Sequence, residues 1–478
     1  MSANIISLLA ASSAVVIYLL NQYRARADIE DEFVSNVIIP YLRLSRRRRY
    51  HAQRRRSRHR SKWSVVQSEL TDRQFRRYFR MNPELFDELC SVIKDLVGEE
   101  EFKSEEYLSF CLDDDDPNQS NNIAKAHAKS TGGFISGEVK LAMTLRILGG
   151  GSFMDIAMLF GNSFNHAHKI VGSVVENWLL HPQFYPIDGT AYCRDQDRMR
   201  NVARQFHVAS QGIMTGCIGA IDGWVVKVKP PSARDGVHDP ASFYSRKGFF
   251  GINVQAIVDK NKRVLYRSIL SRGAEHDSTA FKNCSLYAWL MDNWNTLREL
   301  GYYFIGDSAY ALRSFIHTPY DNALHGTPED NYNFFHSSAR ISVECAFGEI
   351  DLRWGIFWRP LQYSLRRNIQ IIDACMRLHN FIIDHRPSSL SLDNIDRDVF
   401  DDECRRFFYE NPAEEGVFGG ESDPRLDARG GRPLRIDTTL AELGRNWRDE
   451  NRDDIARQGL SRPPSNWFRD RNRLISDM

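Results

Sequence analysis

Residues 215–231, TGCIGAIDGWVVKVKPP, are the stretch that decides the fold of this 478-residue chain. An apolar run typical of a buried β-strand leads to one carboxylate, Asp222, and two prolines then stop the strand. We expect Asp222 to sit at the end of that strand. An ionised carboxylate in an apolar setting is costly unless a cation pairs with it or it holds a metal ion. The stretch therefore predicts a functional acid whose partners come from elsewhere in the chain.

The composition is that of an ordinary soluble protein, with 42% hydrophobic residues, 26% charged residues and a formal net charge of +1. A chain of this length accommodates two domains plus tails. Its eight cysteines include no CxxC pair, which argues against a zinc finger and against a disulfide scaffold. A reducing compartment is the simpler interpretation.

The N-terminal residues 1–62 contain an apolar segment and an Arg-rich arm. Residues 43–62 carry ten Arg and one Lys without any acid, which favours nuclear import and phosphate contact over a merely solvated charge run. Residues 5–20 are a continuous apolar run, shorter than a comfortable membrane span, with no basic residue before it. We expect a nuclear protein, and a membrane signal anchor at residues 5–20 is the less favoured alternative.

Residues 63–210 show helical periodicity and predict an all-α domain. Within it, residues 136–180 have the outline of a helix-turn-helix, with short helices separated by Gly-containing turns. The last of these helices would expose Asn165, His168 and Lys169 to DNA. The alternative is an ordinary three-helix packing unit with a solvated face.

Residues 212–385 change to strand signals followed by helices, typical of an α/β domain. The predicted strands are 217–228, 251–258, 264–270 and 302–310, and the predicted helices are 278–300, 337–354 and 368–385. Residues 386–478 lose apolar density and predict a mostly disordered tail, with at most a short helix near 440–447.

Three acids recur at positions that a sheet can bring together. Asp222 and Asp307 each end a predicted strand, and Glu344 lies beside the apolar stripe of a later helix. Clustered carboxylates repel one another unless cations hold them, and oxygen-rich sites suit Mg²⁺ or Mn²⁺. A pair of such ions serves in-line phosphodiester chemistry. Glu349 and Asp351 are less favoured third acids because they fall on other helix faces.

Several motifs in this region resemble the PIF/Harbinger-type transposases and the nucleases derived from them, in the DDE superfamily. The motifs are GAIDG around Asp222, FYSRKGFFGINVQAIVD from Phe243, HDS at 276–278, GDSAY around Asp307, RISVECAFGEIDLRW with Glu344, and LHNFI from Leu378. The resemblance covers residues 222–383 and implies an RNase H-like catalytic core. It further implies Asp-Asp-Glu metal ligation and DNA cleavage with strand transfer.

Residue by residue, the resemblance assigns the catalytic acids to Asp222, Asp307 and Glu344. It also makes Asp277 an accessory metal ligand, for which the alternative is an N-cap of the following helix. The chain departs from the family pattern at Ala309, Cys345 and Asp351, and these departures remove no carboxylate of the triad.

Three basic residues near the acids have two interpretations each. Arg246 and Lys247 either hold a phosphate or form a solvated hairpin edge. Arg340 lies one helical turn before Glu344 and either pairs with it or contacts a phosphate.

The motifs and the resemblance thus predict a metal-dependent DNA endonuclease or transposase. It would use two Mg²⁺ or Mn²⁺ ions and act on DNA. The alternative is a domesticated, non-cutting DNA-binding protein that keeps the fold. The resemblance also implies a Myb-like DNA-binding partner protein, and we expect a homo-oligomer.

Overall fold

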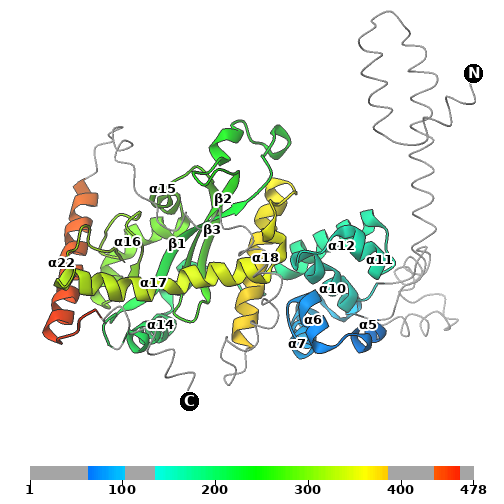
Figure 1. The fold of residues 1–478 in the computed structure, drawn as a ribbon, viewed down its shortest axis with the longest axis horizontal. Coiled ribbons are helices and arrows are strands. Elements are labelled where there is room, and N and C mark those ends of the chain that lie inside the picture. Colours follow the sequence, from blue (N-terminus) through cyan, green and yellow to red (C-terminus); the bar gives the residue numbers. More distant parts are fainter. Residues whose placement is uncertain (1–62, 103–134, 211, 386–434, 463–478) are drawn as a thin grey trace, which may run out of the picture.

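The computed structural model describes residues 63–102, 135–210, 212–385 and 435–462, which form a helical part and an α/β part (Figure 1). The apolar run 5–20, the Arg-rich arm 43–62 and most of the polar tail lie outside the described residues. None of the described helices has an apolar stretch long enough to cross a membrane.

The helical part begins with three helices whose ends match the sequence signals. They are α5 (Trp63–Glu69), α6 (Asp72–Phe79) and α7 (Pro83–Val97). Asn82 caps α7, because its side chain accepts a hydrogen bond from the backbone N–H of Leu85, and Pro83 occupies the first turn as predicted. The buried rings of Phe75, Phe79 and Phe86 pack together and anchor this part.

The helix-turn-helix-like unit consists of α10 (Gly137–Leu148), α11 (Phe153–Leu159) and α12 (Phe164–Ser173). The Ser152 side chain and Asp155 form a capping box at the start of α11. The last helix continues beyond α12 as a π-helical segment, Val174–Leu179, whose Val174, Val175 and Trp178 are buried. Helix α13 (Gly189–Arg194) and helix α14 (Gln196–Ala209), the latter capped by Asp195, then lead to the sheet.

A five-stranded mixed sheet forms the centre of the α/β part, with the order β3-β2-β1-β4-β5. The strands are β1 (Cys217–Lys227), β2 (Gly251–Val258), β3 (Val264–Arg272), β4 (Tyr303–Ile305) and β5 (Ile316–His317). The first three strands are antiparallel neighbours, and β4 and β5 add parallel to β1. This order, with helices on both faces, confirms the predicted RNase H-like core.

The prediction that Asp222 ends its strand is wrong in one respect. Asp222 lies in the middle of β1 and pairs with Ala256 of β2. Its other neighbour, β4, pairs with β1 only as far as Ala220 and Ile305. Asp222 is therefore beyond the end of the parallel pairing, at the edge where the chain leaves β4 toward Asp307.

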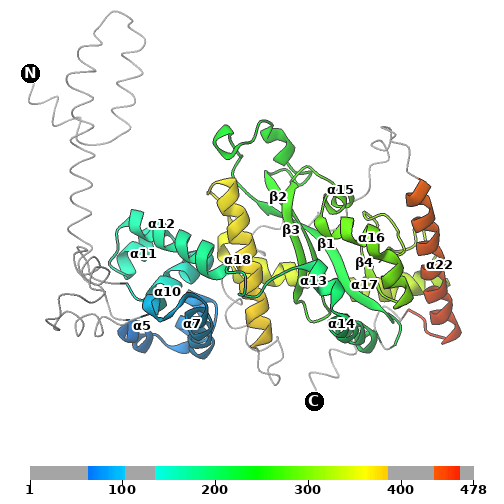
Figure 2. The ribbon, with the colours of Figure 1, turned by 180° about the vertical axis from the view of Figure 1, so that it is seen from behind.

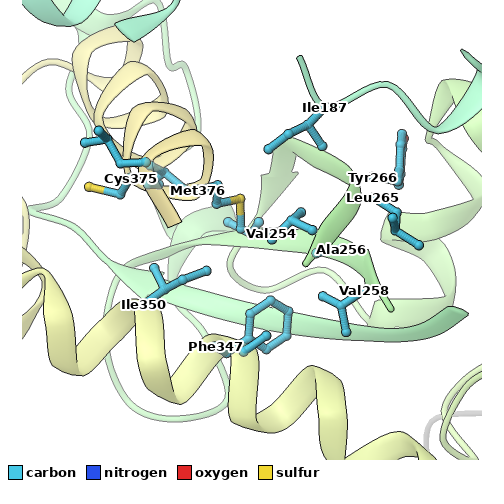
Figure 3. Close-up of a cluster of buried hydrophobic side chains, with 14 of the residues drawn as sticks. Ile187, Val254, Ala256, Val258, Leu265, Tyr266, Phe347, Ile350, Cys375 and Met376 are labelled. Carbon is cyan, nitrogen blue, oxygen red and sulfur yellow. The ribbon is translucent and has the colours of Figure 1, made fainter. Parts of the chain in front are cut away.

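The two faces of the sheet are covered by different helices. Helices α17 (Pro328–Arg353) and α18 (Leu365–Asp384) lie in front of the sheet in Figure 1, and α13 and α16 (Ser285–Glu299) lie in front in the reverse view of Figure 2. Figure 3 shows the packing on the α17 side. There, Phe347 and Ile350 of α17 and Met376 of α18 gather near the apolar residues of β2, all of them buried (Figure 3).

Two helix predictions need correction. The helix predicted over 278–300 is two helices, α15 (Asp277–Lys282) and α16, separated at Asn283 and Cys284. The helix that carries Glu344 begins at Pro328 rather than near residue 337, because Thr327 caps it and Pro328 occupies the first turn. This helix therefore begins more than two turns earlier than the sequence predicted.

The prediction of a mostly disordered tail with a short helix near 440–447 is also wrong for part of residues 386–478. Helix α22 (Arg435–Arg457) packs against the first turns of α17 and near β5, at the edge of the sheet (Figure 1). The Trp447 ring contacts the rings of Tyr303 and His317, and Arg448 lies over the Tyr320 ring at 3.8 Å. These ring contacts hold α22 against the domain although the helix is rich in charged residues. A prediction from the average composition of the tail cannot include such single contacts.

Candidate active site

Asp222 is held rigidly at the centre of the candidate site. Its Oδ1 accepts a hydrogen bond of 2.8 Å from the backbone N–H of Gly223, and 17% of its side chain is exposed. Even-numbered residues of β1 face α17, as the stacking of Trp224 on Phe347 shows. The side chain of Asp222 therefore points toward the helix that carries Glu344.

Asp307 lies two residues beyond the end of β4, close enough to Asp222 for their charges to interact. Its Oδ1 accepts a hydrogen bond of 3.0 Å from the backbone N–H of Ala309. The Ala309 side chain, where the family pattern has glycine, leaves this turn intact. Each aspartate is thus oriented by a backbone N–H one or two residues further along the chain.

Arg340 joins Asp222 to Glu344. Its Nη1 donates to Asp222 Oδ2 at 3.0 Å, and its Nη2 donates to Glu344 Oε1 at 2.5 Å. The guanidinium is largely buried, with 19% of the side chain exposed, whereas 49% of the Glu344 side chain is exposed. The structure therefore shows the ion pair between Arg340 and Glu344 that the helical spacing suggested, and adds Asp222 as a second partner.

The electrostatics of the site show a deficit of positive charge. Burial raises the pKa of Asp222 to about 7, against the opposing effect of Arg340, and the charge of Asp307 raises it further. Burial also raises the pKa of Asp307, to which the carboxylates of Asp277 and Glu344 add. One guanidinium thus faces three carboxylates, Asp222, Asp307 and Glu344.

The three carboxylates are donors of the chemical type that a hard divalent cation prefers. Carboxylate oxygens are preferred ligands of Mg²⁺ and Mn²⁺, and a cation would relieve the repulsion that raises these pKa values. Among the residues that the structure describes, no three acidic, imidazole or thiol side chains lie close enough together to hold a metal ion. Arg340 stands between Asp222 and Glu344, so it is the group with which a bound cation would compete.

Asp277 does not cap its helix and does not face the same way as Asp222. It is the first residue of α15, whose N-cap is His276. A Cβ built on Gly223 would lie 2.0 Å from Asp277 Oδ1, so Asp277 contacts β1 at an odd-numbered residue. Because successive residues of a strand face opposite sides, Asp277 lies on the reverse face of β1 from Asp222.

Sequence reasoning missed the residues that surround Asp277. Asn253 Nδ2 and Gln255 Nε2 donate to Asp277 Oδ1 at 2.9 and 2.8 Å, and the Tyr310 hydroxyl donates to Gln255 Oε1 at 2.6 Å. The available signal was the pair of polar residues, Asn253 and Gln255, at alternate positions of the otherwise apolar β2. A buried amide requires hydrogen-bond partners, so these residues indicate a polar group packed against that face of the strand.

The other acids and the basic pair lie apart from this cluster. Glu349 forms an ion pair with Lys262, and the half-buried Asp351 has Lys227 as its charged neighbour, so neither joins Asp222. Arg246 and Lys247 are exposed in the turn between Ser245 and Gly248, before β2. That position leaves them accessible to a phosphate.

The three residues predicted to face DNA differ in exposure. Asn165 and Lys169 are exposed on α12. His168 is partly buried, because its ring stacks on Phe153 with 3.5 Å between ring centroids and contacts Phe164 edge-on. Burial lowers the pKa of His168. The His168 side chain therefore packs α12 against α11, which leaves Asn165 and Lys169 as the outward-facing pair.

Comparison with known proteins defines the class of the α/β part. Residues 221–380 match the model of the DDE superfamily endonuclease family, a range that contains Asp222, Asp277, Asp307 and Glu344. This match confirms the resemblance to the DDE superfamily that the motifs suggested. No solved structure matches the chain.

Sequence similarity to individual proteins extends beyond this domain. The chain is 24% identical to "Protein ALP1-like" of Arabidopsis thaliana over 334 residues, covering 66% of this chain and 72% of the relative. It is 30% identical to "Putative nuclease HARBI1" of Rattus norvegicus over 182 residues, covering 36% of this chain and 47% of the relative. The corresponding protein of Mus musculus is 27% identical over 262 residues, covering 52% and 68%.

Proposed function

We propose that the chain is a metal-dependent DNA endonuclease or transposase whose catalytic acids are Asp222, Asp307 and Glu344. The observation that supports the proposal is the placement of these acids by β1, by the end of β4 and by α17 inside a DDE endonuclease domain. The three acids would hold Mg²⁺ or Mn²⁺. When bound, such ions supply Lewis-acid stabilisation of phosphodiester displacement.

The chain's own residues supply orientation and charge. The backbone N–H groups of Gly223 and Ala309 fix one oxygen of Asp222 and of Asp307. The second oxygen of Asp222 accepts a hydrogen bond from Arg340, so a cation would have to displace that guanidinium to bind there. Glu344 is half exposed and so lies on the side from which DNA would approach. Arg246 and Lys247 would contact the DNA backbone, as would Lys169 and Asn165 of the helical part.

A nicking assay on supercoiled plasmid DNA with Mg²⁺ tests the proposal. We expect the unaltered chain to convert supercoiled DNA to open circles, and Asp222→Ala and Glu344→Gln each to lower the rate at least about 100-fold. Glu299→Gln, at an exposed acid at the end of α16, is the matched control and should leave the rate unchanged. Equal nicking by the unaltered chain and by Asp222→Ala would contradict the proposal.

The alternative is a domesticated DNA-binding protein that does not cut. The pairing of Arg340 with both Asp222 and Glu344 favours it, because the guanidinium already supplies a counter-ion to these acids. In that case gel-shift experiments would show DNA binding, while plasmid nicking with Mg²⁺ or Mn²⁺ would be absent.

A further inference from the structure

Asp277 lies on the side of β1 opposite to Asp222. Asp222 pairs with Ala256, and its neighbour Trp224 stacks on Phe347 of α17. Gly223 pairs with Gln255, and the carboxylate of Asp277 lies against it on the α15 side. One strand therefore separates the carboxylate of Asp277 from the pair formed by Asp222 and Arg340.

The oxygen of Asp277 that touches the strand is already used by protein donors. Asn253 Nδ2 and Gln255 Nε2 both donate to Oδ1, and Asn253 Nδ2 also donates to the backbone oxygen of Glu275 at 3.0 Å. Gln255 Nε2 additionally donates to Asn253 Oδ1 at 2.8 Å. Both amides are buried, so their orientation is set by this network.

The network ends at the loop that carries Asp307. The Tyr310 hydroxyl donates to Gln255 Oε1 at 2.6 Å, and Tyr310 is buried three residues after Asp307. Gly306 permits this arrangement, because a Cβ there would lie 2.9 Å from the Tyr310 ring and 3.0 Å from Ile221. Hydrogen bonds thus link α15, β2 and the Asp307 loop behind β1.

We propose that Asp277 is a positioning residue behind β1 rather than a fourth metal ligand, and that Asn253, Gln255 and Tyr310 connect it to the Asp307 loop. The network holds the middle of β1 and the loop after β4 at the spacing that Asp222 and Asp307 need on the other face. Gly223 is required at the contact, because any side chain there would displace the carboxylate. This inference rests on the proposed function of Asp222 and Asp307.

The distinction between a ligand and a positioning residue is testable by conservative replacement. In Asp277→Asn the amide oxygen accepts the same two hydrogen bonds, whereas Asp277→Ala removes the acceptor and leaves two buried donors unsatisfied. We expect Mn²⁺ affinity, measured by calorimetry on the full chain without DNA, to stay within about threefold for Asp277→Asn and to fall roughly 10-fold for Asp277→Ala. Asp222→Asn, the reference ligand variant, should lose Mn²⁺ binding.

Tyr310→Phe probes the far end of the network. We expect kcat for plasmid nicking to fall roughly 10-fold and the KM for DNA to stay unchanged. The assay is run well below the unfolding temperature of the variant. Tyr287→Phe is the matched control, because its ring also packs edge-on against Phe281. A merely structural role would lower the unfolding temperature of Tyr310→Phe and leave kcat unchanged, which would overturn the proposal.

The outcomes separate this inference from the proposed function. Loss of Mn²⁺ binding in Asp277→Asn to the same extent as in Asp222→Asn would make Asp277 a ligand and overturn the inference alone. Equal Mn²⁺ binding and nicking by the unaltered chain and by Asp222→Asn would overturn both. If Asp277→Ala fails to fold, Asp277→Asn and Tyr310→Phe still decide the question.

Discussion

Arg340 Nη1 lies 3.0 Å from Asp222 Oδ2, although 118 residues separate the two in the chain. The contact joins α17 to the middle of β1, and the same guanidinium also binds Glu344. A buried carboxylate of this kind requires a counter-ion, and Arg340 supplies it within the protein. The pairing therefore links the stability of the domain to the charge balance of its site.

Replacement of Arg340 should expose that link. We expect Arg340→Gln to lower the free energy of unfolding at neutral pH by roughly 1–3 kcal/mol, because Asp222 and Asp307 then lack their nearby cation. Added Mn²⁺ should raise the unfolding temperature of the variant more than that of the unaltered chain, since no guanidinium competes. Thermal unfolding with and without Mn²⁺ measures both effects.

The matched control for that variant is Arg200→Gln, which breaks an exposed pair with Asp197 on α14. It should change the free energy of unfolding by less than about 0.5 kcal/mol. Equal Mn²⁺ stabilisation of Arg340→Gln and the unaltered chain would contradict competition between Arg340 and the cation.

Replacement by alanine at two glycines, Gly223 and Gly348, should change the free energy of unfolding in opposite directions. Gly223→Ala places a Cβ 2.0 Å from Asp277 Oδ1, so we expect destabilisation of at least about 2 kcal/mol. Gly348 lies within α17 with nothing within 4 Å of an added Cβ, so Gly348→Ala should stabilise the chain by roughly 0.5–1 kcal/mol. Urea unfolding curves of both variants test the contrast, and a neutral Gly223→Ala would contradict the close approach of Asp277.

Helix α22 should contribute to the stability of the domain. Trp447→Ala removes the ring that contacts Tyr303 and His317, and we expect a loss of roughly 2–4 kcal/mol in unfolding free energy. Glu450→Ala, at an exposed position of the same helix, should be nearly neutral. An unfolding temperature equal to that of the unaltered chain for Trp447→Ala would show that α22 does not stabilise the domain.

Acidification should destabilise the domain through His336, a buried residue of α17. Its ring is buried and its Nε2 lies 3.1 Å from the backbone oxygen of His317, and burial lowers its pKa to about 4. The unfolded chain takes up a proton below about pH 6.5, whereas the folded chain does not until about pH 4. The contribution of His336 to stability is therefore complete above about pH 6.5 and is lost as the pH falls, by up to about 3 kcal/mol at pH 4.

His336→Gln should reduce that loss, because glutamine can donate a hydrogen bond and does not titrate. Denaturant unfolding at pH 7 and at pH 5 measures the difference in stability for each protein. The same replacement at the exposed His238 should leave the difference unchanged. An unaltered difference in His336→Gln would show that His336 does not cause the acid sensitivity.

The residues alone indicated the α/β class, four of the five strands of the sheet and the two strand-associated aspartates, but not β5. Apolar runs closed by turn residues mark buried strands whatever surrounds them, which is why β2 was predicted with its observed bounds. The start of α17 and the folding of α22 were missed, because capping and distant aromatic contacts outweighed a polar composition there. The local sequence pattern thus predicted most strands and helices, but not those whose bounds depend on distant contacts.

Only the tertiary structure decided which side chains share a face and which charges meet. The sequence placed Asp277 with the catalytic acids by motif, but the pleat of β1 and the close contact at Gly223 put it on the reverse side. The same holds for Arg340, whose second partner comes from a strand 118 residues away. Strand order and helix docking bring together residues that are far apart in the chain, and a local pattern does not specify such contacts.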